Sequence, residues 1–200
     1  NVLVIVCDQL RASVLNAYAP SAVPTPHIDA LAREGVVFDN AITASTVCAP
    51  ARASMLTGRH VCDHDAWTNN MPCREGLEYY PQRMRAAGYD TAAFGVLDHF
   101  PHDDMCGFRH CRLMEGGLQG DKEEYLAFLR QRHPEVTRIF NGSNFEFAFA
   151  EDEFYDYWTA SRAIEYIEER AACPQEPFLA YVGFLSPHTP LIPPREVHGT

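Results

Sequence analysis

The segment that begins Cys48-Ala-Pro-Ala-Arg and continues to Leu-Thr-Gly-Arg holds the residue types and spacing best suited to chemistry. Pro50 fits the first turn of a helix and Gly58 fits its end, so the pattern predicts a helix over residues 51–56. At the N-terminus of a helix, free N–H groups and the positive end of the dipole attract an anion, and Arg52 can reach the same anion with its planar fork. The spacing therefore predicts a cradle for a tetrahedral anion, although it also fits a buried Cys48 with Arg52 as a solvated surface charge.

Two further sets of polar residues follow apolar runs that are typical of strands. Residues 2–6 form a continuous run of Val, Leu and Ile, as in a strand buried on both faces of a parallel sheet, and Asp8 and Gln9 come after it. The last apolar run, residues 178–184, leads to His188 in a Pro-His-Thr-Pro loop. Because ligands bind outside the carboxyl ends of parallel strands, we expect Asp8 and His188 to meet in one crevice.

Strands and helices alternate along the chain, which predicts an α/β fold with a mainly parallel sheet flanked by helices. Further short strands are expected at residues 36–38 and 91–95. Further helices are expected at residues 28–34, 80–87, 121–132 and 154–170. In the last of these helices, the predicted core-facing stripe consists of Tyr157, Ala160, Ile164 and Ile167.

Length and composition are those of an ordinary globular domain. The 200 residues are 46% hydrophobic and 22% charged, and no apolar run approaches the roughly 18 residues of a membrane span. With 16 basic and 27 acidic residues the net charge is −11, which argues against nucleic acid as a partner. The 7 cysteines are an odd number, so reduced thiols are expected rather than a disulfide framework.

Neither end of the sequence has the pattern of a domain boundary. The chain opens on Asn1 in a strand-like run, with no initiator Met and no visible signal peptide, and closes at Thr200 in a Pro-rich loop. We therefore expect residues 1–200 to be part of a longer domain, incomplete at both ends. The sequence determines neither compartment nor oligomeric state, and the interpretation leans towards the cytoplasm.

Cys-x-Pro-x-Arg followed by Leu-Thr-Gly-Arg resembles the signature of the type I sulfatases, which belong to the alkaline phosphatase superfamily. Other segments resemble the same family, and they follow one another in the order expected for it. They are Asp8-Gln9, Thr25 to Ala32, Gly35 to Phe38, Gly88 to Ala92, Pro177 to Leu179 and Pro187 to Pro190. The resemblance covers essentially the whole chain and implies the N-terminal part of an alkaline-phosphatase-like sulfatase domain.

The resemblance implies a sulfuric ester hydrolase that cleaves a sulfate monoester, a small anionic substrate. A formylglycine-generating enzyme would oxidise Cys48 to formylglycine, whose hydrate supplies the nucleophile. A divalent metal, calcium or alternatively magnesium or manganese, would be bound by Asp8, Gln9 and the oxidised Cys48. The second metal half-site of the family is expected beyond Thr200.

Two departures from the family pattern leave the substrate open. Asp8 is followed by Gln where many sulfatases have two aspartates, which resembles the branch of phosphonate monoester hydrolases, phosphodiester hydrolases and choline-sulfatase-like enzymes. Residues 95–99, Gly-Val-Leu-Asp-His, stand where many members have Gly-Lys-x-His, so the lysine is absent and the histidine is displaced. The alternatives are a phosphonate monoester or phosphodiester hydrolase of the same superfamily, and a non-catalytic sulfatase-like binding protein.

Three more side chains complete the predicted site. His99 is a candidate catalytic group, with a surface loop histidine as the alternative. Asn69 lies 21 residues after Cys48, where phosphonate monoester hydrolases place an asparagine that contacts substrate, and it also fits a simple turn. His188 matches the family histidine that hydrogen-bonds the substrate and assists the leaving group, with a structural loop residue as the alternative.

Other clusters of metal-capable residues are interpreted as solvated loops, because none has the spacing of a zinc site. These are His60 with Asp63, His64 and Asp65, then His99 with His102, Asp103 and Asp104, and finally Cys106 with Cys111. Zinc is therefore not predicted from the sequence.

Overall fold

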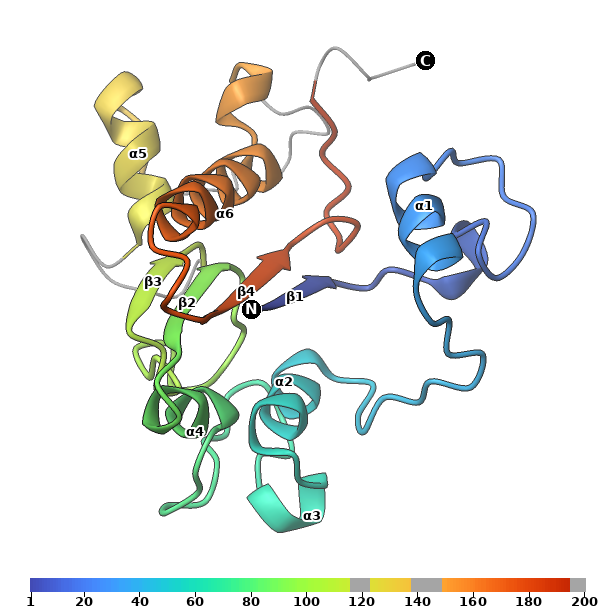
Figure 1. Cartoon of the computed structure of the whole chain (residues 1–200). Coiled ribbons are helices and arrows are strands. Elements are labelled where there is room, and N and C mark those ends of the chain that lie inside the picture. The colour runs from blue at the N-terminus through green and yellow to red at the C-terminus, as the bar shows by residue number, and fades with distance from the viewer. Residues whose placement is uncertain (116–122, 138–148, 195–200) are drawn as a thin grey trace.

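The computed structural model describes residues 1–115, 123–137 and 149–194, and a four-stranded sheet lies at its centre (Figure 1). The strands are β1 (Val2–Cys7), β2 (Asp90–Gly95), β3 (His110–Leu113) and β4 (Phe178–Phe184), in the spatial order β1-β4-β2-β3. Every pair of neighbouring strands is parallel. The carboxyl ends of the strands therefore lie at one edge of the sheet, and the predicted α/β fold class is confirmed.

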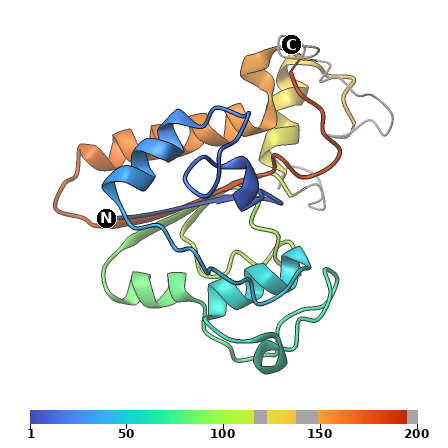
Figure 2. The ribbon, with the colours of Figure 1, turned by 90° about the vertical axis from the view of Figure 1, so that its right-hand side faces the viewer.

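Helices pack against both faces of this sheet (Figure 1 and Figure 2). On one face are α2 (Cys48–Thr57) and α4 (Tyr80–Ala86), and on the other are α5 (Glu124–Arg132) and α6 (Tyr155–Ala171). Helix α3 (Val61–His64) packs against α2, whereas α1 (Pro26–Glu34) lies away from the sheet (Figure 1) and has no buried residue. Two 3-10 turns lie at Ala12–Val14 and Glu151–Glu153. Side chains of β2 alternate between two cores, since Phe94 packs with Tyr166 of α6 and Ala93 packs with Leu56 of α2. None of the described helices is both long and apolar enough to cross a membrane.

The central strands β2 and β4 each carry a glycine where they pair at their carboxyl ends, Gly95 opposite Gly183. A Cβ added to Gly183 would lie 1.9 Å from the carbonyl oxygen of Val96, and one added to Gly95 would lie 2.1 Å from the carbonyl oxygen of Gly183. Gly95 also has a φ of 76°, a conformation that side chains other than that of glycine disfavour. Both positions therefore require glycine, and the chain after β2 leaves the sheet in a fixed direction.

The prediction that the first strand is buried on both faces is wrong. Leu3 and Ile5 of β1 are 48% and 56% exposed. Within the described residues β1 pairs with β4 alone, so it forms an edge of the sheet. A continuous apolar run identifies a strand, but it does not reveal how much of the chain covers that strand.

Two other predictions about buried apolar segments are also wrong. No strand forms at residues 36–38, where Val36 and Phe38 are 79% and 70% exposed, because no described strand lies beside them to pair with. In α6 the predicted stripe is wrong at Tyr157 and Ile164, which are exposed, whereas Ile167 does pack against the core. The buried side chains of this helix include Trp158, Ala163 and Tyr166. Apolar residues lie on more than one side of this helix, so periodicity alone did not select the buried face.

The remaining predicted elements are confirmed with small shifts of their ends. The helix predicted over residues 121–132 is observed from Glu124, and residues 121 and 122 lie outside the described residues. The cysteines are all free, as expected for reduced thiols.

Candidate active site

Helix α2 begins at Cys48, which places this side chain at the positive end of the helix dipole. The preceding residue, Val47, is extended, and Pro50 lies in the first turn, where its missing N–H leaves no hydrogen bond unmade. Gly58 ends the helix in the left-handed conformation, with φ 67°. Local sequence therefore determines both ends of α2, and with them the position of Cys48, which is half-buried.

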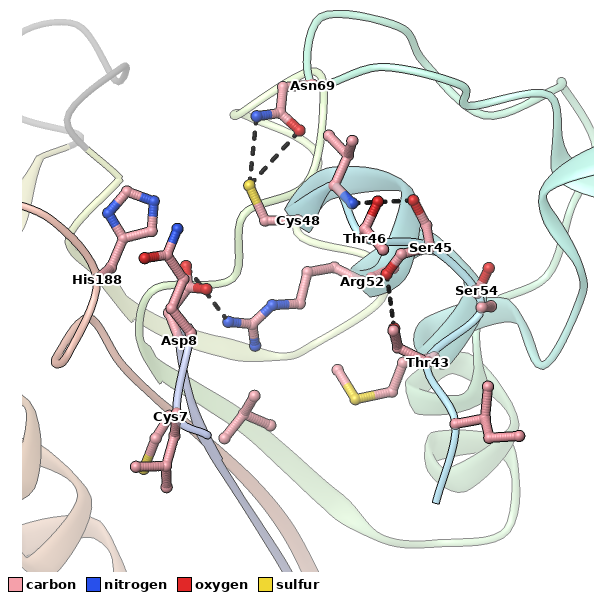
Figure 3. A pocket seen from close by; sticks show the side chains of 18 of the residues that line it. Cys7, Asp8, Thr43, Ser45, Thr46, Cys48, Arg52, Ser54, Asn69 and His188 are labelled. Atoms are coloured by element: carbon pink, nitrogen blue, oxygen red, sulfur yellow. Dashed lines mark hydrogen bonds and ion pairs between the residues drawn. The ribbon is translucent and has the colours of Figure 1, made fainter. Parts of the chain in front are cut away.

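A cavity of about 900 Å³ opens in front of Cys48, at the carboxyl edge of the sheet (Figure 3). Its walls come from the end of β1, the loop of residues 42–47, the first turns of α2 and single side chains from later segments. The predicted site residues that line it are Asp8, Gln9, Cys48, Arg52, Asn69 and His188. The structure thus gathers residues from widely separated parts of the chain around one crevice.

Arg52 is only 5% exposed and is held between the sheet and the cavity. Its Nη1 donates a hydrogen bond to the hydroxyl of Tyr181 on β4, and its Nη2 lies 3.9 Å from Oδ2 of Asp8 (Figure 3). The alternative of a solvated surface charge is therefore wrong. A buried, fixed guanidinium beside the N-terminus of α2 makes this end of the cavity suited to an anion.

Asp8 and Gln9 present oxygen atoms at the end of β1. The Asp8 N–H donates to the carbonyl oxygen of Phe184 at 3.0 Å, which extends the pairing with β4 past the strand and fixes the backbone. Gln9 has a φ of 57° and turns the chain away from the sheet, with its side chain exposed at the cavity. Carboxylate and amide oxygens are the hard donors that calcium and magnesium prefer, so these residues fit half of a site for such a metal.

The Asn69 side chain contacts the first two residues of α2, Cys48 and Ala49. Its Oδ1 accepts a hydrogen bond from the Ala49 N–H at 3.1 Å, and its Nδ2 lies 3.3 Å from Sγ of Cys48 (Figure 3). The residue lies in a turn, as one interpretation had it, and it contacts Cys48 as well. Its amide therefore orients residue 48 and satisfies a backbone donor in the first turn of the helix.

His188 lines the same cavity from the loop after β4 (Figure 3). The loop is positioned by α6, because the Asp156 carboxylate accepts hydrogen bonds from the N–H groups of Leu185 at 2.9 Å and Ser186 at 3.2 Å. Nδ1 of His188 bonds to the carbonyl oxygen of Thr189, which can only accept, so Nδ1 carries the proton. In the neutral ring Nε2 is then left as an acceptor.

His99 does not line the cavity. It is 3% exposed, and its Nε2 lies 3.2 Å from the hydroxyl of Tyr79 and 3.7 Å from Sγ of Cys73. Burial lowers the pKa of its imidazole. His99 is therefore not among the residues that line the cavity, and the alternative of a surface loop histidine is wrong.

Asp98, which the sequence analysis did not select, is the residue of this loop that faces Cys48. Burial raises the pKa of the Cys48 thiol, and a hydrogen bond with Asp98 and the charge of its carboxylate raise it further. Asp98 is held in place because its N–H donates to the Glu115 carboxylate, at 2.9 Å to Oε1. Its position directly after β2, at the same edge of the sheet as Asp8, was the available signal.

The raised pKa has a chemical consequence for the cavity. A thiol is nucleophilic as its thiolate, and carboxylates beside Cys48 disfavour that form. The arrangement offers an anion a helix N-terminus and a buried guanidinium, and it offers a hard cation the oxygens at the end of β1.

Comparisons with known proteins agree with this geometry. The sulfatase family model matches residues 1–200. An arylsulfatase of Clostridium perfringens is 27% identical over 98% of this chain and 44% of its own length. An ulvan-active sulfatase of Formosa agariphila is 32% identical over 95% of this chain and 36% of its own length.

Among solved structures, phosphonate monoester hydrolase of Agrobacterium radiobacter superposes with a TM-score of 0.78. It is 29% identical and aligns with 98% of this chain, which covers 42% of that protein. The chain thus spans less than half the length of the relatives it matches.

Proposed function

Because the chain belongs to the sulfatase family, we propose that residues 1–200 form the N-terminal part of the catalytic domain of a hydrolase that cleaves sulfate monoesters. The observation that carries this proposal is the buried Arg52, fixed by Tyr181 and Asp8 beside the helix N-terminus at Cys48. A sulfate ester presents a tetrahedral oxyanion. The guanidinium fork of Arg52 and the positive end of the α2 dipole suit such a group.

In this proposal Cys48 is converted to formylglycine by a formylglycine-generating enzyme. Burial and the Asp98 carboxylate raise the pKa of the Cys48 thiol, which supports a modified residue rather than a cysteine nucleophile. The hydrated aldehyde would supply one hydroxyl for attack on sulfur and a second for release of the anion. Asn69 would orient this group, and the Asp98 carboxylate is close enough to accept a proton from one of its hydroxyls.

Asp8, Gln9 and the modified residue 48 would hold a divalent metal, calcium or alternatively magnesium or manganese. Such an ion supplies positive charge that lowers the pKa of a nearby hydroxyl and neutralises oxygens of the ester. His188 would hydrogen-bond the substrate and, when both ring nitrogens are protonated, donate to the leaving oxygen. Arg52 would keep the oxyanion in line with residue 48.

A second candidate, hydrolysis of a phosphonate monoester or a phosphodiester, is supported by the loop after β2. Val96 is a buried apolar side chain, 6% exposed, where many sulfatases have a lysine that contacts the ester. The similarity to phosphonate monoester hydrolase of Agrobacterium radiobacter supports the same candidate. Both ester types present a singly charged tetrahedral group, so the anion cradle accepts either.

The test is a comparison of kcat/KM for a matched aryl sulfate, phenylphosphonate ester, phosphodiester and phosphate monoester, using the full-length, formylglycine-bearing protein. We expect the singly charged esters to react faster, because the second charge of a phosphate monoester would be poorly compensated in this partly buried pocket. If the phosphonate ester or the phosphodiester has the highest kcat/KM, the second candidate is favoured. A phosphate monoester that reacts faster than all three would contradict the interpretation of the pocket.

The same preparation separates an enzyme from a sulfatase-like binding protein. We expect mass spectrometry of the peptide containing residue 48 to show formylglycine after co-expression with a formylglycine-generating enzyme. A residue 48 that stays an unmodified thiol, together with no turnover of any of the esters, would support the binding protein instead.

A further inference from the structure

A second cluster of metal-capable side chains lies on the α2 and α4 side of the sheet, outside the cavity. One ligand atom each from His99, Asp104 and Cys106 lie within 4.8 Å of one another. Sγ of Cys73 lies 3.7 Å from Nε2 of His99. The residues come from the loop before α4, the loop after β2 and the turn before β3, which explains why spacing in the sequence did not reveal them.

Two of the four side chains are buried, and Cys73 and Asp104 are partly buried. Cys106 is fully buried and His99 is 3% exposed. Nδ1 of His99 has no hydrogen-bond partner among the described residues, although buried polar atoms in proteins are nearly always paired. Oδ1 of Asp104 accepts a hydrogen bond from the Cys106 N–H at 2.9 Å, and Oδ2 accepts a long one from the hydroxyl of Tyr79 at 3.5 Å.

We propose that Cys73, His99, Asp104 and Cys106 form a structural zinc site. Two sulfurs, one imidazole nitrogen and one carboxylate oxygen make a donor set that matches tetrahedral zinc, whereas calcium and magnesium select oxygen donors alone. Both thiols release their protons to solvent when they bind the ion. With all four positions filled by the protein and aromatic side chains of Tyr79 and Phe108 in the same core, the site is closed rather than catalytic.

The position of the cluster gives the ion a role in the neighbouring cavity. His99 follows Asp98, the residue whose carboxylate lies against Cys48. An ion bound to His99, Asp104 and Cys106 would tie the loop after β2 to the turn before β3 and to the loop that carries Cys73. Zinc would therefore hold Asp98 in place without contacting the substrate.

Cobalt substitution tests the proposal directly. The full-length protein carrying Cys48→Ala, which removes the thiol of the cavity, is stripped of metal and titrated with Co²⁺. We expect one equivalent of cobalt to produce a thiolate-to-cobalt charge-transfer band and the intense visible bands of tetrahedral coordination, and zinc to displace them. A folded protein that shows neither band would overturn the proposal.

Variants distinguish these ligands from other thiols. Cys106→Ser and Cys73→Ser, each in the Cys48→Ala protein, should lose the charge-transfer band or reduce it by about half. The matched control is Cys111→Ser, because Cys111 is a partly buried thiol that packs in the same core on β3. An unchanged band in the Cys106 variant, or a loss in the control alone, would show that the cluster is not the site.

A second measurement covers variants that fail to fold. Metal analysis of the protein with native Cys73, His99, Asp104 and Cys106, purified without added metal, should give one zinc per chain. A strong chelator should lower its Tm, and added zinc should restore it. Absence of zinc together with a Tm that neither chelator nor zinc changes would also refute the proposal.

Discussion

Cys48 and Cys106 lie on the same side of the sheet in opposite chemical surroundings. Cys48 is half-buried at a helix N-terminus, beside a cavity lined by oxygen donors and a buried arginine. Cys106 is fully buried among aromatic rings, with a histidine and a second thiol nearby. Burial is the main cause of a raised pKa in both thiols, so the pKa does not separate them. The two cysteines differ in their access to solvent and in the donor atoms around them. Position 48 suits a residue that is modified and reacts, whereas position 106 suits a ligand of a soft metal.

The largest effect should come from removing the reactive group. Cys48→Ala should lower kcat by about 10⁴-fold or more, as expected when the nucleophile of an enzyme is lost, while Tm changes little. Cys106→Ala should do the reverse, with a lowered Tm and, in the fraction that stays folded, measurable turnover. Steady-state kinetics and thermal unfolding of the full-length variants check both. Substantial turnover by Cys48→Ala would contradict the claim that residue 48, unlike Cys106, supplies the reactive group.

The second largest effect should come from Gly183→Ala, which should disturb the surroundings of both Cys48 and Cys106. Gly183→Ala would place a Cβ 1.9 Å from the Val96 carbonyl oxygen, and backbone atoms cannot move aside as a flexible side chain can. We expect a loss of about 3 kcal/mol or more in the free energy of unfolding, measured by chemical denaturation. Gly88→Ala is the comparison variant, because a side chain there is strained by a φ of 88° although its Cβ would meet no atom within 4 Å. Equal losses for the two variants would show that the close approach of β2 and β4 is not what matters.

Arg52→Lys should have an intermediate effect that is confined to the cavity. The charge is kept, but a lysine cannot make the two-point contact with Tyr181 and Asp8 and still face an oxyanion. We expect kcat/KM for the preferred ester to fall about 10²-fold. Arg59→Lys, another arginine at the cavity wall, is the control and should keep most of the activity. Unchanged kcat/KM in the Arg52 variant would remove Arg52 from the site.

The smallest effect should come from Asn69→Ala. This change removes the hydrogen bond that the Ala49 N–H donates and the contact with Sγ of Cys48. We expect kcat/KM to fall about 10-fold and the unfolding free energy to fall by about 1 kcal/mol, the cost of a lost helix cap. Asn70→Ala, the adjacent exposed residue, should change neither. If Asn69→Ala and Asn70→Ala had the same kcat/KM and the same unfolding free energy, Asn69 would be only a turn residue.

Local patterns were sufficient for much of the cavity. Pro50 and Gly58 delimit α2, and apolar runs before Asp8 and His188 place these residues at the carboxyl edge of the sheet. What failed depended on contacts between distant segments. The exposure of Ile5, the buried face of α6 and the meeting of Cys73 with His99 are all decided by the packing of chain that lies far away in sequence.

The order of strands in the sheet determines how long β1 waits during translation before its partner strand has been made. Val2 of β1 pairs with Leu179 of β4, so β1 has no described partner until residues 3–178 have been synthesised as well. At usual translation rates the wait is roughly ten to thirty seconds. During that time an apolar strand with unpaired backbone groups is open to wrong pairing with other nascent chains. Yield of this protein should therefore depend on chaperones that shield β1 while translation proceeds.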